Sequence, residues 1–144
     1  MKNMEAQQPT HRTHRKAKKI LMVEDDKVVQ KLIADTLTAA DYEVMTAHNS
    51  ATAVKLAREQ EPDLVTLDVE LAKDSPDDSW DGFSIAGWLG RLHEGRQKPV
   101  LVVISGSREP DKLVERAAGL GVFTYLTKPI EKQRLLNTVA AALQ

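Results

Sequence analysis

The sequence predicts an α/β domain in which helices cover both faces of a parallel β-sheet. Short apolar runs of strand length alternate five times with segments whose apolar residues recur at helical spacing. Each connection is long enough for a helical crossover, as parallel strands require. Several runs are apolar throughout, which is typical of strands buried on both faces. We expect strands at residues 19–23, 42–47, 64–68, 100–104 and 122–127.

The first two helices are defined by their caps and by their apolar spacing. Asp26 is a good N-cap for a helix whose apolar face begins at Val29. Asn49 or Ser50 caps the second helix. This helix must end before Pro62, because the residue that precedes a proline avoids the helical conformation.

Three further helices follow the third, fourth and fifth strands. A long polar and acidic stretch, residues 69–81, precedes a third helix at about 82–93. Pro110 suits the first turn of a fourth helix that reaches about Leu120. The fifth helix spans about 131–143. With these helices the chain forms a single domain with two helical layers around one sheet.

Composition excludes several classes of chemistry. At 144 residues with 42% apolar content, the chain suffices for one packed domain. It has no cysteine, which excludes disulfide bonds, Cys-ligated zinc and a catalytic thiol. No apolar run is long enough to span a bilayer, and no signal-peptide core is present, so we expect a cytoplasmic protein without a membrane span.

Charge is unevenly distributed, although the net charge of the whole chain is only −1. Residues 1–19 hold six Lys or Arg and one acid, whereas the remainder holds 14 basic and 20 acidic residues. We interpret residues 1–17 as a basic, disordered arm and residues 18–144 as the folded domain. The arm is either a solvated tail or a segment that contacts nucleic acid or an acidic partner through its charge.

Polar and charged side chains stand at the ends of four predicted strands. In chain order they are Glu24, Asp25, Asp26, Asp68, Ser105 and Lys128. In open α/β sheets, ligands bind outside the carboxyl ends of the strands. We therefore expect these residues to form one site, with Asp26 serving either as the helix cap or as a further metal ligand.

The acids of this site need positive charge beside them. Two like charges about 4 Å apart repel by roughly 4 kcal/mol at an effective dielectric near 20. Lys128 is one candidate for the counter-charge, and a hard divalent ion such as Mg²⁺, held by Glu24 and Asp25, is another. A carboxylate such as Asp68 can attack phosphorus and form an acyl phosphate, and Ser105 supplies a hydroxyl donor.

The chain resembles the receiver domain of two-component response regulators over residues 18–144. The matching motifs occur in order, mostly at predicted strand ends: Val23-Glu24-Asp25-Asp26, Asp68, Ser105-Gly106, Tyr125 and Lys128-Pro129. Each motif alone has low specificity, and their combination in this order identifies the family. The resemblance implies a flavodoxin-like, doubly wound (βα)5 sheet with strand order 2-1-3-4-5.

The resemblance implies a metal and a phosphoryl donor. Mg²⁺, or Mn²⁺ in its place, is expected on Glu24, Asp25, Asp68 and the backbone carbonyl of Glu70. Asp68 is expected to be phosphorylated by a sensor histidine kinase or a histidine phosphotransfer protein. The chain would then be a phosphoacceptor with self-catalysed phosphotransfer and autodephosphorylation rather than a conventional enzyme.

The resemblance also implies how the signal is sensed and read. Lys128 is expected to pair with the phosphate, with a cis peptide bond to Pro129. Ser105 and Tyr125 are expected to act as the switch residues. Glu70 occupies a position that tunes dephosphorylation in this family, as does the residue at 107. A downstream protein is expected to bind the face formed by the fourth helix, the fifth strand and the fifth helix, with no fused DNA-binding domain.

One departure from the family pattern follows Asp68. Asp81-Gly82 lies thirteen and fourteen residues after Asp68, so the intervening loop is longer than usual by about six residues and unusually acidic. The loop is either solvated or an element of partner specificity. The position four residues after Asp68, often proline in the family, is Ala72.

Three alternative functions stay open at this stage. The chain could be a phosphorelay intermediate that passes phosphate to a histidine phosphotransfer protein, or a receiver-like adaptor that is not phosphorylated. A haloacid-dehalogenase-type phosphatase would need a hydroxyl residue at position 72, where this chain has alanine. The sequence therefore favours the receiver.

Overall fold

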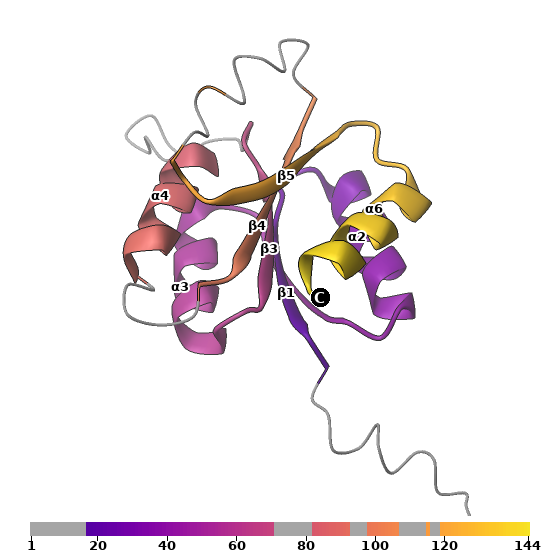
Figure 1. Cartoon of the computed structure of the whole chain (residues 1–144), viewed down its shortest axis with the longest axis horizontal. Helices are drawn as coiled ribbons and strands as arrows, with labels where there is room; N and C mark the ends of the chain where they lie inside the picture. Colours follow the sequence, from indigo (N-terminus) through magenta and orange to yellow (C-terminus); the bar gives the residue numbers. More distant parts are fainter. Residues whose placement is uncertain (1–16, 71–81, 93–97, 107–114, 116–118) are drawn as a thin grey trace, which may run out of the picture.

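A five-stranded parallel sheet forms the centre of the molecule, with the strand order β2-β1-β3-β4-β5 (Figure 1). The structure is a computed structural model that describes residues 17–70, 82–92, 98–106, 115 and 119–144. The strands are β1 (Lys19–Val23), β2 (Glu43–Ala47), β3 (Leu64–Asp68), β4 (Val100–Ser105) and β5 (Val122–Thr127). The order confirms the flavodoxin-like, doubly wound topology that the resemblance implies.

Helices cover both faces of the sheet. They are α2 (Lys27–Ala39), α3 (Ser50–Gln60), α4 (Gly82–Leu92) and α6 (Lys132–Ala142). The helices α2 and α6 lie side by side on one face, and α3 and α4 lie together on the other (Figure 1). The central strands are therefore shielded from water on both sides, as the apolar runs in the sequence indicate.

Successive side chains of β1 pack into two different cores. Ile20 and Met22 belong to the core beneath α2 and α6, whereas Leu21 and Val23 belong to the core beneath α3 and α4. All four side chains are at most 1% exposed. Because the strand alternates faces with a period of two residues, a strand that is buried on both faces has to be apolar at every position.

The predicted helix starts agree with the capping geometry. The Asp26 carboxylate accepts the N–H groups of Val28 and Val29, at 2.8 and 3.2 Å, and so caps α2. Asn49, rather than Ser50, caps α3. These carboxylate and amide oxygens satisfy backbone donors that have no partner within the first turn of a helix.

Small differences from prediction occur at element ends. The second strand begins at Glu43 rather than at residue 42, because the Tyr42 N–H bonds the carbonyl of Leu37 and closes the end of α2. The last helix spans Lys132–Ala142, with Glu131 at its N-cap position instead of inside it.

Some predictions fall on segments outside the described residues. These are residues 1–16 of the arm, most of the acidic stretch (71–81), and the predicted end of the third helix at about residue 93. Of the fourth helix predicted at 110–120, the structure describes Glu115, which is helical, and Gly119 and Leu120, which lie in a turn.

The strand register brings the ends of β3, β4 and β5 to one edge of the sheet. Asp68 is paired with Ile104, and Ser105 with Thr127. The end of β1 joins the same edge, because Val23 is paired with Leu67. Any side chains at these four strand ends are thereby placed together.

Among the helices that the structure describes, none is both long enough and apolar enough to cross a membrane.

Replacing Asp26 with alanine should lower the free energy of unfolding by about 1 kcal/mol, because it removes the side-chain cap of α2. Chemical denaturation followed by circular dichroism would measure this loss. Asp35→Ala is the matched control, since this exposed acid on the same helix forms a surface ion pair with Lys31 and does not cap the helix. An equal loss in both variants would contradict a capping role for Asp26.

Candidate functional site

The polar residues predicted from the strand ends gather at the carboxyl edge of the sheet. Glu24 directly follows β1, Asp68 ends β3, and Ser105 ends β4. Lys128 directly follows β5. Glu24, Asp68 and Ser105 are each at most 2% exposed, so this polar group lies beneath the surface rather than on it. Such burial is unusual for carboxylates unless they have charged partners.

Three carboxylates form the acidic part of the site. One oxygen from each of Glu24, Asp25 and Asp68 lies within 4.8 Å of the others. At that separation each pair of negative charges repels by about 3 kcal/mol at an effective dielectric near 20. The cluster is therefore stable only with positive charge or protons nearby.

The Lys128 ammonium supplies positive charge to two of these acids. Its Nζ lies 3.1 Å from Oε1 and 3.4 Å from Oε2 of Glu24, and 3.3 Å from Oδ2 of Asp68. The peptide bond between Lys128 and Pro129 is cis, as the resemblance implies. The Lys128 N–H also donates to the Ser105 carbonyl at 2.9 Å, so the end of β5 is fixed beside the end of β4.

The electrostatic balance shifts the pKa values of Glu24 and Lys128. Burial raises the pKa of Glu24 from 4.5 to about 7, and the charge of Asp68 adds to the rise, while the Asp26 N–H and Lys128 oppose it. For Lys128, burial disfavours the ammonium, but Asp68 and Glu24 together outweigh burial and raise its pKa. Lys128 is therefore a fixed cation. Glu24, by contrast, is the group whose charged form is destabilised.

Backbone and side-chain donors hold Glu24 in place. The Asp26 N–H donates to Oε2 of Glu24 at 3.1 Å, and the Gln30 side-chain amide on α2 donates to the Glu24 carbonyl at 2.6 Å. The role of Gln30 was not predicted, because nothing in helical spacing indicates that a polar residue in the first turn reaches back to the preceding strand end.

The donor set fits a hard divalent cation. Oε1 of Glu24 is buried and makes no hydrogen bond, although it lies within ion-pair distance of Lys128. Carboxylate oxygens are the ligands that Mg²⁺ prefers, and it is typically held by one or two of them. Glu24, Asp25 and Asp68 are the residues that would hold it.

The Glu70 carboxylate contacts the end of β4, whereas the carboxylates of the other predicted metal ligands form the acidic cluster. Its N–H donates to Oδ1 of Asp68 at 2.8 Å, which folds the chain back over the end of β3. Its carboxylate extends to the end of β4, where Oε1 accepts the Ser105 hydroxyl at 3.1 Å and the Gly106 N–H at 2.8 Å. The resemblance implies a metal-binding Glu70 carbonyl and a position that tunes dephosphorylation, but it does not predict this contact of the carboxylate with the end of β4.

Tyr125 lies on β5 and is half-buried. It packs against an apolar cluster of Val69, Phe83 and Val103, which connects the residue after Asp68 to α4. The structure therefore joins Tyr125 to the surroundings of Asp68 through packing.

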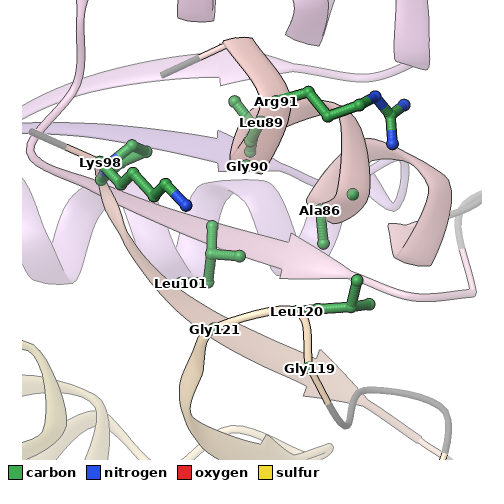
Figure 2. Close-up of a pocket in the computed structure, with 11 residues that line it drawn as sticks. Ala86, Leu89, Gly90, Arg91, Lys98, Leu101, Gly119, Leu120 and Gly121 are labelled. Carbon is green, nitrogen blue, oxygen red and sulfur yellow. The ribbon is translucent and has the colours of Figure 1, made fainter. Parts of the chain in front are cut away.

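The apolar pocket shown in Figure 2 lies elsewhere. It has a volume of about 330 Å³ and lies between α4, the segment before β4 and the turn before β5. Lys98 and Gly121 line it, and both precede their strands, so it opens at the amino edge of the sheet. None of the predicted site residues lines this pocket.

Comparison with known proteins identifies the class of this fold and site. Residues 20–140 match the response regulator receiver domain family, and the chain belongs to that family. It is 32% identical over 126 residues to the polar-differentiation response regulator DivK of Brucella anthropi, covering 88% of this chain and 96% of that relative. DivK of Brucella ovis has the same identity and coverage.

Solved structures agree with this assignment. The receiver domain of NtrX from Brucella abortus is 26% identical, with a TM-score of 0.74 over 86% of this chain and 97% of that chain. A CheY-like receiver domain protein from Methanospirillum hungatei JF-1 has a TM-score of 0.76 over 89% of this chain and 94% of that one. At 20% identity, the latter similarity supports the fold alone.

Replacing Glu24 with glutamine should remove a pH-dependent loss of stability. A carboxyl whose pKa is raised from 4.5 to about 7 on folding binds more protons in the folded state between those values. Its contribution to stability therefore declines as pH rises through this range. The stability of Glu24→Gln relative to the wild type should be about 1–3 kcal/mol more favourable at pH 8 than at pH 5.

Denaturant unfolding of the metal-free protein at both pH values would measure this difference. Glu43→Gln is the control, because Glu43 is an exposed carboxylate on β2. A Glu24→Gln variant whose relative stability is independent of pH would contradict the electrostatic description of the cluster.

Proposed function

We propose that this chain is a response regulator receiver that accepts a phosphoryl group on Asp68 from a phosphohistidine. The donor is a sensor histidine kinase or a histidine phosphotransfer protein. The proposal rests on one observation above all: the nearly fully buried Asp68 carboxylate lies beside a fixed ammonium, Lys128, within a cluster of acids that fits Mg²⁺. Membership of the receiver family supports the same conclusion.

The transfer exchanges one bond to phosphorus for another. A carboxylate oxygen of Asp68 forms the new P–O bond while the P–N bond to the donor imidazole breaks. The electron pair of that bond goes to the imidazole nitrogen, which then takes a proton from water. Hydrolysis later returns Asp68 to its carboxylate and releases inorganic phosphate. The residues contribute position and charge, which is what phosphoryl transfer chiefly requires.

Each residue of the site has a defined part in this proposal. Lys128 neutralises charge on the phosphoryl oxygens, and Ser105 donates its hydroxyl to one of them. Glu24 and Asp25, with Asp68, hold Mg²⁺ or Mn²⁺, which when bound neutralises negative charge on both the acids and the phosphoryl group. The Glu70 carbonyl would complete the ligand set.

Phosphorylation is read by a protein partner in this proposal. Ser105 and Tyr125 form the switch, because one contacts the phosphoryl group and the other lies on the adjacent strand. The partner binds the face that includes β5 and α6, together with the helix predicted at 110–120. Phe123 on β5 is 52% exposed, which supports a contact surface there. The chain would act in the cytoplasm, as residues 18–144 folded behind a basic arm.

Incubation with acetyl phosphate and Mg²⁺ should add one phosphate to the wild type, measured by intact-protein mass spectrometry. Asp68→Asn should add none, because the amide is not a nucleophile toward phosphorus. A chelator should abolish the gain in the wild type.

Asp63→Asn is the matched control, since Asp63 accepts the Lys19 N–H at the opposite edge of the sheet. It should be phosphorylated like the wild type. No mass gain in the wild type, or an undiminished gain in Asp68→Asn, would refute the proposed function.

A further inference from the structure

The Glu70 side chain adds a contact between the ends of β3 and β4, which the backbone already pairs through the Val69 N–H and the Ile104 carbonyl. One oxygen, Oε1, accepts both the Ser105 hydroxyl and the Gly106 N–H, at 3.1 and 2.8 Å. Both bonds have a charged acceptor, and such bonds are roughly twice as strong as neutral ones. Glu70 is otherwise exposed, so its carboxylate is held by these contacts and not by burial.

The two donors are those that an anion on Asp68 would need. Ser105 is 1% exposed, and its carbonyl accepts the Lys128 N–H, so its backbone is anchored beside the phosphorylation site. An acyl phosphate on Asp68 carries about two negative charges where the carboxylate carried one, and it places three phosphoryl oxygens next to these donors. The Glu70 carboxylate and the phosphoryl group therefore require the same hydrogen bonds and repel each other.

We propose that Glu70 is a latch, in which its carboxylate holds the Ser105 hydroxyl and the Gly106 amide until a phosphoryl group on Asp68 displaces it. This inference rests on the proposed function and adds a regulation of the same site. The latch stabilises the unphosphorylated arrangement and lowers the apparent affinity of the site for the phosphoryl group by the same factor.

The latch can open without disturbing the fold. Glu70 is exposed, so its carboxylate is rehydrated when it leaves. The Ser105 backbone is paired with Thr127 within the sheet, so opening the latch requires only that the Glu70 and Ser105 side chains turn. The Glu70 N–H bonds Oδ1 of Asp68, so the turn that carries the latch begins at the phosphorylated residue itself.

Binding of the beryllium trifluoride anion, a phosphoryl analogue, in the presence of Mg²⁺ tests the latch. Calorimetry or fluorine NMR of the full chain would give the affinity. Glu70→Ala should bind the anion about tenfold more tightly than the wild type, and Glu70→Gln should lie between them, because its neutral amide oxygen still accepts weakly.

Two controls separate a latch from a general charge effect. Glu131→Gln removes a carboxylate beyond the end of β5 that makes no capping hydrogen bond, and it should change the affinity by less than about twofold. In a Ser105→Ala background, the gain from Glu70→Ala should shrink, because one of the two contested donors is gone.

The Gly106 amide gives an independent readout. Its proton resonance should move upfield in Glu70→Ala without any anion, because it loses a carboxylate acceptor. A substitution that only weakened the fold would not change this single signal.

Three results would overturn the latch: no gain in affinity in Glu70→Ala, an equal gain in Glu131→Gln, or a gain that Ser105→Ala leaves unchanged. Failure of the wild type and all variants to bind beryllium trifluoride would instead refute the proposed function, and the latch with it.

Discussion

Repulsion among buried carboxylates is the constraint on which the site depends. Oxygens of Glu24, Asp25 and Asp68 lie within 4.8 Å of one another, and two of these residues are almost fully buried. The Lys128 ammonium, 3.1 Å from Glu24 and 3.3 Å from Asp68, offsets part of this repulsion. Burial still raises the pKa of Glu24 to about 7, so the single charge of Lys128 does not fully stabilise the carboxylates of the cluster. A divalent cation would supply the additional positive charge, and this is why the site suits one.

The fold makes this arrangement possible by aligning strand ends. Parallel strands with helices on both faces bring Asp68, Ser105 and Lys128 to one edge, although they lie far apart in the sequence. Two apolar cores hold the strands rigidly, so the positions of the charges are fixed. The same edge carries the Gly106 backbone amide and the buried Ser105 hydroxyl, and both donate to the Glu70 carboxylate. The repelling carboxylates and the hydrogen-bond donors that Glu70 occupies therefore lie at the same edge of the sheet.

The sequence predicts the sheet and its polar edge because both follow from local patterns. Doubly buried strands are apolar at every position, and the acids, serine and lysine at their ends interrupt those runs. The contact between Glu70 and Ser105 was not predictable in this way. It joins residues 35 positions apart, and it depends on β3 and β4 being neighbours and on the direction of the turn after Asp68. The Gln30 contact with the Glu24 carbonyl depends likewise on how α2 leaves β1.

The stability of Lys128→Met, with and without Mg²⁺, tests the electrostatic constraint most directly. At pH 8 in a chelator, the variant should lose about 2–4 kcal/mol of unfolding free energy, because Asp68 loses the cation beside its buried charge and Glu24 must either do the same or take up a proton. Added Mg²⁺ should stabilise the variant more than it stabilises the wild type, since the ion then supplies the missing charge. A variant as stable as the wild type without metal, or one that gains no more from Mg²⁺, would contradict this explanation.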